Sequence, residues 1–527
     1  DLPSSLKNKL EDVRLLYAAY VEATKDRFFD SADTLERLTD CLTAERIGNC
    51  RFYLYDFLSF TAQEKAVLAR MVTNGKSVTV ATVADDRANR ASVIDNAVAL
   101  AVKEVCGAVG CEFKKEFFTC HASFFTKKLS SALFFNSPIR AVDLPDGTVT
   151  VVSSPSIDEE CLALAKFVRN HVREGGLYKD VKVVCSDVSQ YAYALNRRFG
   201  DYSVPFYLDE KTSLDKTVAA EYLTSFLDCH LANFDIEKIL RFAKNPLFET
   251  NVSAFETFAR EYNVNFNYDE FDIGKEHAFF AEADATRAKI KEFVCDVTVP
   301  KAARAADYVE ILKKIVVEHD IVKKTETYSE RLKGYGYQRE AEILSQAQAK
   351  IDEVLGQVTE IFGNTEMDLK RFIVGLTSSL ASQTISVLPT KNDCVFVSNL
   401  DKGKDHDVKV LAVLGANESE LPKVYKNCAL LSDKNIEDLS KRGLSVEISL
   451  EQKNRQEKFS LFNLLCEPVD KLYVSYKTKN GKEEVRPSAF VSVVKKCFNV
   501  KESLPVFAED KKTVLNKAIL ARTALKE

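Results

Sequence analysis

The sequence lacks three features that would place it in a common protein class. No apolar run approaches the roughly 20 residues of a membrane-spanning helix, which argues against a membrane protein. No C-x-x-C pair occurs among the thirteen cysteines, and the closest set (Cys106, Cys111, Cys120 and His121) is spaced too widely for an ordinary zinc site. There is also no excess of basic residues, because the formal net charge is −5. Any binding of nucleic acid must therefore use a local cluster of cations.

The cysteines and the length indicate what kind of chain this is. An odd, dispersed set of thirteen cysteines favours free thiols in a reducing cytoplasm over a disulfide framework. A chain of 527 residues is too long for one core and predicts three or four domains. It begins at Asp1 rather than at methionine, so we expect a fragment of a longer protein.

Strands and helices alternate in two parts of the chain. Arg51–Tyr55 and Ser77–Val83 read as strands with a helix between them, after a helical start over residues 4–47. The alternation returns downstream, where the predicted strands are 148–152, 181–185, 204–207, 393–397, 408–414 and 471–476. Strand–helix–strand order predicts a parallel α/β sheet.

A long helical stretch interrupts the second set of strands. From about Leu214 to Ala381 one amphipathic helix follows another, with no strand pattern between them. The sequence therefore predicts an α/β class with parallel sheets, one of which is split by an all-helical insertion.

Four segments in this order carry a resemblance to a known family. They are Phe52–Glu64 (FYLYDFLSFTAQE), Leu177–Asp209, Ile385–Pro422 and Phe459–Pro487. Together they resemble AddB, also called RexB, the B component of the bacterial AddAB helicase–nuclease, which has the layout of a UvrD-like superfamily-1 helicase. The resemblance covers roughly residues 51–490.

The resemblance implies a division of the chain into domains, with two RecA-like domains of degenerate P-loop NTPase type. The expected parts are a helical 1B-like segment (1–50), a first RecA-like domain of 1A type without its P-loop (51–145), a second RecA-like domain of 2A type (146–213 and 385–500), an all-helical 2B-like insertion (214–384) and a tail leading towards a missing nuclease domain (501–527).

The residues that hydrolyse ATP in such helicases are missing. No G-x-x-x-x-G-K-[ST] loop occurs, and the triplet Gly75-Lys76-Ser77 leads from a helix into a strand, whereas a P-loop leads from a strand into a helix. The Walker B position, which should carry two carboxylates, reads Tyr55-Asp56. Two positions that carry arginine in active helicases hold Ser186 and Glu467, and a carboxylate would repel the phosphate. We therefore predict a chain without catalytic residues or a metal site, and regard the histidines other than His406 as structural.

Three groups of residues are candidate DNA contacts, each with a plainer alternative. The loop Leu400–Lys409 offers Lys402, Gly403, Lys404, His406 and Lys409 to phosphates, and the alternative is a solvated turn. Phe57 and Phe60 could stack on bases, although core packing is the more usual fate of phenylalanine. Lys471 and Lys477 stand beside Tyr473 and Tyr476 at a strand end, where the alternative is an ordinary solvated hairpin.

These observations favour one hypothesis and leave two others open. The resemblance implies a helicase-like, non-motor scaffold that binds single- or double-stranded DNA in double-strand break repair and recombination, reads the hotspot Chi, and pairs with an AddA-like helicase–nuclease subunit. It also implies an iron–sulfur cluster and magnesium in a nuclease domain, for which the residues after Val500 offer no ligands. One alternative is a divergent superfamily-1 ATPase. The other is an interaction scaffold that does not bind DNA, and the negative net charge favours this second alternative.

Overall fold

The computed structural model describes most of the chain. The described residues are 3–24, 31–83, 97–118, 124–133, 139–264, 268, 274–387, 392–402, 408–426, 430–444, 449–467 and 469–503. They form two compact units, which we call the sheet unit (residues 1–209 with 391–527) and the helical unit (residues 210–390). The insertion predicted over residues 214–384 falls within the helical unit, and the finer domain boundaries stay a prediction.

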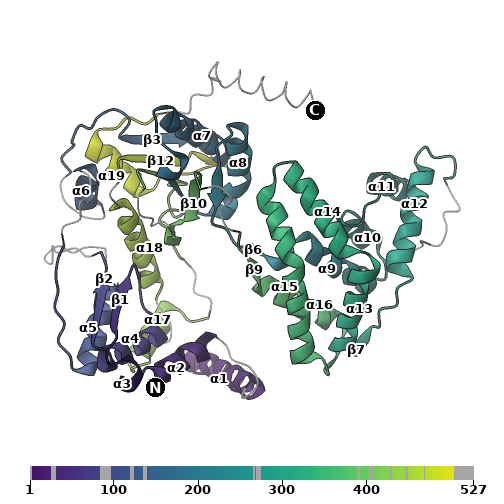
Figure 1. The fold of residues 1–527 in the computed structure, drawn as a ribbon, viewed down its shortest axis with the longest axis horizontal. Helices are drawn as coiled ribbons and strands as arrows, with labels where there is room; N and C mark the ends of the chain where they lie inside the picture. Colours follow the sequence, from purple (N-terminus) through teal and green to yellow (C-terminus); the bar gives the residue numbers. More distant parts are fainter. Residues whose placement is uncertain are drawn as a thin grey trace. The chain divides into compact units, whose positions relative to one another are not determined.

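The sheet unit begins with helices and a small parallel sheet (Figure 1). The helices are α1 (Ser4–Thr24), α2 (Ser31–Cys41), α3 (Ala44–Ile47), α4 (Ala62–Asn74), α5 (Ala97–Val109) and α6 (Phe124–Ala132). The strands β1 (Arg51–Tyr55) and β2 (Ser77–Ala81) pair in parallel, with Arg51 opposite Ser77, and α4 connects them. The predicted strand–helix–strand unit is therefore present, and in both strands every second residue is exposed.

A six-stranded parallel sheet forms the centre of the sheet unit. Its strands are β3 (Val149–Ser154), β4 (Val181–Cys185), β5 (Phe206–Leu208), β10 (Val395–Asn399), β11 (Val410–Leu414) and β12 (Lys471–Lys477), and their order is β3-β12-β11-β4-β10-β5. All five neighbouring pairs run parallel. The central strands β4 and β11 are buried along their whole length, as expected for a parallel sheet covered on both faces.

Helices cover the two faces of this sheet and form two apolar clusters. One cluster joins the sheet to α7 (Ile157–Arg173) and α8 (Val188–Asp201). The other joins it to α6, α18 (Leu450–Leu465) and α19 (Ala489–Phe498). The remaining elements of the unit are short, namely α17 (Asp433–Ser440), the hairpin β13 (Lys479–Asn480) with β14 (Glu483–Glu484), and the 3₁₀ turns Tyr178–Asp180 and Leu400–Lys402.

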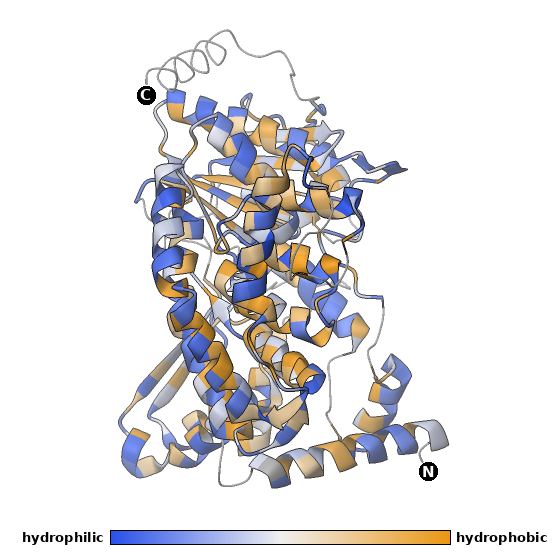
Figure 2. Cartoon of the chain, turned by 90° about the vertical axis from the view of Figure 1, so that its right-hand side faces the viewer, coloured by the Kyte–Doolittle hydropathy of each residue, from blue (hydrophilic) through white to orange (hydrophobic). Residues whose placement is uncertain are grey.

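The helical unit packs around an aromatic core. Its helices are α9 (Val218–Leu231), α10 (Ile236–Ala243), α11 (Val252–Glu261), α12 (Phe280–Ile290), α13 (Ala305–Glu318), α14 (Ile321–Gly334), α15 (Gln338–Phe362) and α16 (Leu369–Ser382). A 3₁₀ turn (Leu214–Lys216) precedes α9, and α12 continues into a π-helical turn over Lys291–Cys295. Hydrophobic and hydrophilic residues alternate along these helices in the manner of amphipathic helices packed on a core (Figure 2).

Two short ladders modify the expectation of an insertion made only of helices. β7 (Ala302–Arg304) pairs antiparallel with β8 (Glu366–Asp368), and each precedes a helix. β6 (Thr212–Ser213) pairs with β9 (Thr384–Ile385) where the chain enters and leaves the unit. Segments this short have no periodicity that a sequence pattern can reveal. The α/β class with a parallel sheet and a helical insertion is nevertheless confirmed.

Candidate nucleic-acid interface

The connection between β10 and β11, which we call the crossover loop (Leu400–Lys409), is the central candidate. Its two strands are parallel and are separated by β4, so the loop must cross a face of β4 to join them. Leu400 and Val408 are both buried in the same apolar cluster as Val184 of β4. Both ends of the loop are therefore anchored on that face. Of the predicted DNA contacts, Lys402 and Lys409 are described, whereas Gly403, Lys404 and His406 lie outside the described residues.

Lys402 already has a carboxylate partner. Its ammonium lies 3.0 Å from the Asp209 carboxylate, and both side chains remain partly exposed. Asp209 is held beside the sheet because its N–H donates to the carbonyl of Val397. A DNA phosphate that binds Lys402 must therefore compete with Asp209. The sequence pattern did not reveal this ion pair.

Lys409, which is exposed, and Lys471, which is half-buried, are cations at the amino edge of the sheet, and each has an acidic partner. The Lys409 ammonium lies 3.2 Å from the Asp180 carboxylate, and Lys471 lies 2.9 Å from Glu174. Burial alone would raise the pKa of Asp180, but the N–H of Leu177 and the Lys409 ammonium outweigh it and lower that pKa. Lys471 lowers the pKa of Glu174 by hydrogen bonding to it. Both carboxylates are held in their charged form, so they partly neutralise this edge.

Lys477 is buried, whereas both sequence-based interpretations of this strand end, a DNA contact and a solvated hairpin, require it to be exposed. Its side chain is 2% exposed, and its ammonium lies 2.9 Å from Glu420. Asn417 holds the main chain of the same residue, because its Oδ1 accepts from the Lys477 N–H and its Nδ2 donates to the Lys477 carbonyl. Tyr473 and Tyr476 are also buried. This strand end is part of the core, and Lys477 cannot reach a phosphate without leaving its ion pair.

Phe57 and Phe60 form a small aromatic platform after β1. Their ring centroids are 4.9 Å apart and the ring planes differ by 30°. Phe57 is 39% exposed and Phe60 is half-buried, so neither ring is fully enclosed in the core, and the choice between base stacking and core packing stays open. Thr61 and Glu64 fix the start of α4 directly afterwards through a capping box. The pair is placed where a base could stack on it.

The positions that should handle ATP do not form one site. Tyr55 ends β1 and Asp56 follows it; both are exposed, and Asp56 has a left-handed conformation (φ 65°). Gly75 caps the end of α4 and Ser77 begins β2, so the Gly75-Lys76-Ser77 triplet does lead from a helix into a strand. An added Cβ at Gly75 would lie 2.6 Å from the Met71 carbonyl, so close packing accounts for this glycine.

Ser186 and Glu467 lie at opposite edges of the six-stranded sheet. Ser186 follows the carboxyl end of β4 and donates its N–H to the Leu414 carbonyl. Glu467 follows α18 and precedes β12, and its carbonyl accepts from the hydroxyl of Thr126. A five-residue strand spans about 17 Å. The structure therefore does not bring the two positions together, and their assignment to one phosphate site stays a prediction.

The described residues offer no metal centre. No three histidine, cysteine, aspartate or glutamate side chains among them come together as a possible ligand set. Of the early cysteine cluster, Cys106 is buried and Cys111 half-buried, while Cys120 and His121 lie outside the described residues. An iron–sulfur cluster needs four thiolates, and the described part of the chain does not supply them.

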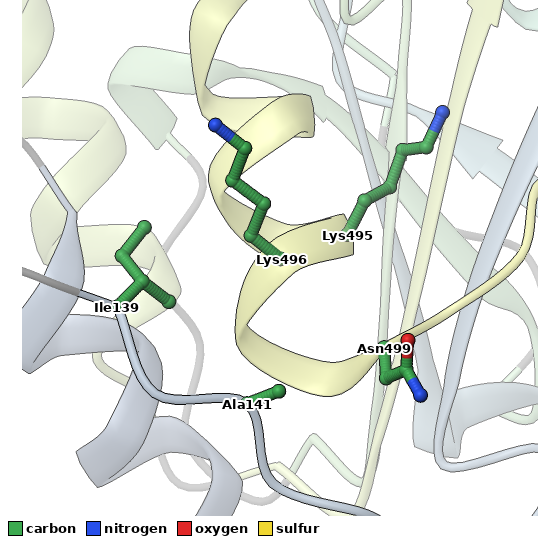
Figure 3. Close-up of a pocket in the computed structure, with 5 residues that line it drawn as sticks. All are labelled: Ile139, Ala141, Lys495, Lys496 and Asn499. Carbon is green, nitrogen blue, oxygen red and sulfur yellow. The ribbon is translucent and has the colours of Figure 1, made fainter.

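A shallow hollow beside the end of α19 is lined by Ile139, Ala141, Lys495, Lys496 and Asn499 (Figure 3). Lys495 is paired with Glu502 at 2.7 Å. The lining contains no carboxylate, thiol or imidazole, so its side chains offer no ligand set for a transition metal.

Two buried polar groups near the candidate residues were not singled out from the sequence. Lys182 is the second residue of β4 and only 2% exposed, and Glu160 of α7 is fully buried at the carboxyl edge of the sheet. A signal for Lys182 does exist, because it interrupts the apolar strand Val181–Cys185, where a charge is rarely found without a partner.

None of the described helices is long and apolar enough to cross a membrane.

Comparison with known proteins identifies the relatives of this chain. A family model described as "ADDB, N-terminal" matches residues 2–117. Relatives whose names describe the B component of an ATP-dependent helicase/deoxyribonuclease match 94% of the chain at 24% identity in Alkaliphilus oremlandii and at 22% in Clostridium botulinum (strain Hall). The one from Staphylococcus haemolyticus matches 95% of the chain at 24% identity. The resemblance to AddB is confirmed.

The likeness to AddB extends along nearly the whole chain but not along the whole of its relatives. The matches cover 46% of each of these three proteins, so the chain spans about half the length of the curated relatives it matches. The family model lies over α1 to α5, which includes the β1–β2 sheet and the Phe57–Phe60 platform. The AddB relatives therefore share both the six-stranded sheet region and the region that precedes it.

Proposed function

We propose that this chain is the helicase-like, non-motor part of a helicase–nuclease subunit and that it holds single-stranded DNA through the crossover loop. The observation that carries the proposal is the geometry of that loop. Its ends are buried on β4, while the exposed ammonium groups of Lys402 and Lys409 project from them. Fixed cations beside an anchored loop suit a phosphate backbone, which is bound by position and not by sequence.

The names of the relatives support the wider role. They describe an ATP-dependent helicase and deoxyribonuclease, so we infer a part in DNA repair and recombination, within a complex whose other subunit supplies the motor. An AddA-like partner, double-stranded DNA as a further ligand, recognition of Chi and a place in the cytoplasm belong to this proposal. The two alternatives make different predictions: a divergent ATPase would turn over ATP, and a pure scaffold would not bind DNA.

The DNA-binding proposal predicts opposite effects for the two partners of one ion pair. Lys402→Ala should weaken binding of single-stranded DNA several-fold and flatten its salt dependence by about one unit, because one phosphate contact is lost. Asp209→Asn should strengthen binding several-fold, because it frees the Lys402 ammonium from the carboxylate at 3.0 Å. Fluorescence anisotropy with labelled oligothymidylate at low and moderate salt measures both.

The control for the change in net charge is Glu45→Gln, which removes a negative charge from an exposed position in α3. We expect it to alter the affinity much less than Asp209→Asn. Equal effects of the two variants, together with no loss in Lys402→Ala, would show that the crossover loop does not contact DNA. No measurable binding by the wild-type chain would favour the scaffold alternative.

The absence of motor residues predicts no ATP hydrolysis. The 527-residue chain should show no turnover with single-stranded DNA present, since Lys76 lies at a helix-to-strand junction and not at a helix N-terminus. A coupled phosphate-release assay on the wild-type chain and on Lys76→Ala tests this. Turnover at ordinary enzyme rates, about 1 per second or faster, would favour the ATPase alternative. Its loss in Lys76→Ala would place the site at the triplet.

A further inference from the structure

Lys182 is an unusual residue for its position. It lies in β4, which is buried over its whole length, and its side chain is only 2% exposed. Taking an ammonium group out of water is costly unless other groups replace its hydration. Its neighbours along the strand, Val181 and Val183, point to the opposite face of the sheet, because side chains alternate along a strand. Lys182 therefore lies on the face that the crossover loop spans.

The Lys182 ammonium is bound to the crossover loop. Its Nζ donates to the carbonyl of Lys402 at 3.2 Å and lies 4.8 Å from the centre of the Phe396 ring. The hydroxyl of Ser398, on the neighbouring strand β10, donates to the same carbonyl at 3.2 Å. Both lone pairs of the Lys402 carbonyl are thus used by groups that belong to the sheet.

In its described part, the crossover loop is held on the sheet by individual side-chain contacts. Crossovers between parallel strands usually contain a helix that packs on the sheet, whereas the described part of the crossover loop has only a 3₁₀ turn over Leu400–Lys402. Leu400 and Val408 anchor the two ends by apolar burial. Between these anchors, the hydrogen bond from Lys182 fixes the main chain of Lys402, and with it the origin of the Lys402 side chain.

We propose that Lys182 is a positioning residue for DNA binding and acts through Lys402. The inference rests on the proposed function, in which Lys402 contacts a phosphate. The buried ammonium holds the Lys402 carbonyl on the sheet, so that the Lys402 ammonium is presented beside Asp209 in one place instead of moving with a free loop. Ordering the loop in advance reduces the conformational entropy that DNA binding must otherwise overcome.

The Lys182→Met variant separates a positioning role from a structural one. Methionine is one atom shorter than lysine, but it keeps most of the apolar stem and removes the charge. Replacing a buried charge by an apolar group of similar size is often neutral or stabilising, so the thermal midpoint should stay equal or rise. The affinity for oligothymidylate should fall several-fold, as is also expected for Lys402→Ala. A residue needed only for folding would lower the midpoint and the affinity together.

A double-mutant cycle tests whether Lys182 acts through Lys402. We expect Lys182→Met to weaken binding several-fold in the wild-type background and less than twofold in the Lys402→Ala background, measured by anisotropy at two salt concentrations. Lys182→Arg, which keeps a buried donor, should restore most of the affinity. Hydrogen exchange should also become faster in the peptide that contains Leu400–Lys402 in Lys182→Met and not in Lys182→Arg.

The outcomes distinguish this inference from the function on which it rests. If Lys402→Ala binds DNA as well as the wild type, the proposed function of the loop fails. If Lys402→Ala is impaired and Lys182→Met is not, or if Lys182→Met is equally harmful in both backgrounds, the function stands and the positioning role of Lys182 is wrong. A fall of the thermal midpoint in Lys182→Met that Lys182→Arg does not repair would also overturn it.

Discussion

Replacing Glu160 with alanine is expected to lower the free energy of unfolding of the sheet unit by about 3–5 kcal/mol, because three buried donors lose their acceptor. The Gly415 N–H and the Ser475 hydroxyl both donate to Oε1 of Glu160, at 2.8 and 2.6 Å. The Tyr191 hydroxyl donates to Oε2 at 2.7 Å. One side chain therefore joins α7 and α8 to the carboxyl ends of β11 and β12.

The Glu160→Gln variant is the matched control. Burial raises the pKa of Glu160 despite its three donors and the nearby Lys477, so a neutral amide resembles the protonated form of the carboxyl group. Its oxygen can still accept from Gly415 and Ser475, and we expect a loss of about 1 kcal/mol. The free energy of unfolding of both variants is measured in urea, with hydrogen exchange in peptides from α7, β11 and β12 as the readout. Similar small losses for alanine and glutamine would show that the network contributes little.

Gly415 shows why this network is sensitive to changes around it. Its φ of 67° favours glycine, and an added Cβ would lie 2.4 Å from the Ser186 hydroxyl and 2.8 Å from the Tyr191 hydroxyl. Ser186, at the position where the resemblance implies an arginine, therefore packs against the turn that carries one of the donors to Glu160. A longer side chain at this position would have to leave the space that serine occupies.

Local patterns were sufficient to predict the strands of both sheets. Arg51–Tyr55 and Val181–Cys185 are strands with the same bounds in the structure, because short β-branched and aromatic runs between turn residues carry a clear signal. The change from alternating strands and helices to helices alone also marked the helical unit. The ladder of β7 with β8 was missed, since three residues do not define a period.

The candidate site was harder to predict, because ion pairs depend on residues far apart in the sequence. Lys402 pairs with Asp209 and Lys471 with Glu174 across long intervals of chain, so the sequence alone could not show that each cation is partly neutralised. Lys477 looks like its exposed neighbour Lys479, yet it is buried against Glu420, because β12 continues through it. Which end of a strand is buried depends on the neighbouring strands and not on the local pattern.

The second large effect expected is a loss of stability of the helical unit in mild acid. His230 and His319 belong to its aromatic core, and burial lowers the pKa of each to about 4 from the ordinary value of 6.5. The His230 ring lies between Phe226 and Phe234, with centroids 4.8 and 5.0 Å away. The unfolded chain takes up these two protons near pH 6.5, whereas the folded unit resists them until about pH 4.

The surroundings of His319 strengthen this effect. Its ring is 4.4 Å from Phe293 and its Nδ1 is 2.9 Å from the Tyr222 hydroxyl. The positive charges of Lys324 and Lys289 also lower its pKa, although burial contributes most. The stabilisation that comes from keeping both rings neutral is complete above pH 6.5 and is lost as the pH falls towards 4. At pH 5 the loss of stability is about 2 kcal/mol for each histidine, taking 1.36 kcal/mol per pKa unit.

Two substitutions should remove this dependence without emptying the core. His230→Phe replaces a ring whose Nε2 is buried without a hydrogen-bond partner among the described residues, and His319→Asn keeps a polar atom within reach of Tyr222. The free energy of unfolding of the helical unit is measured in urea at pH 7 and pH 5, with hydrogen exchange in peptides from α9 and α13 as the readout. Each single variant should lose about half as much stability in acid as the wild type, and the double variant should lose little. Tyr308→Phe, which removes a hydroxyl that donates to the Pro300 carbonyl and does not titrate in this range, should cost the same at both pH values. An acid loss that persists undiminished in the double variant would mean that other groups cause it.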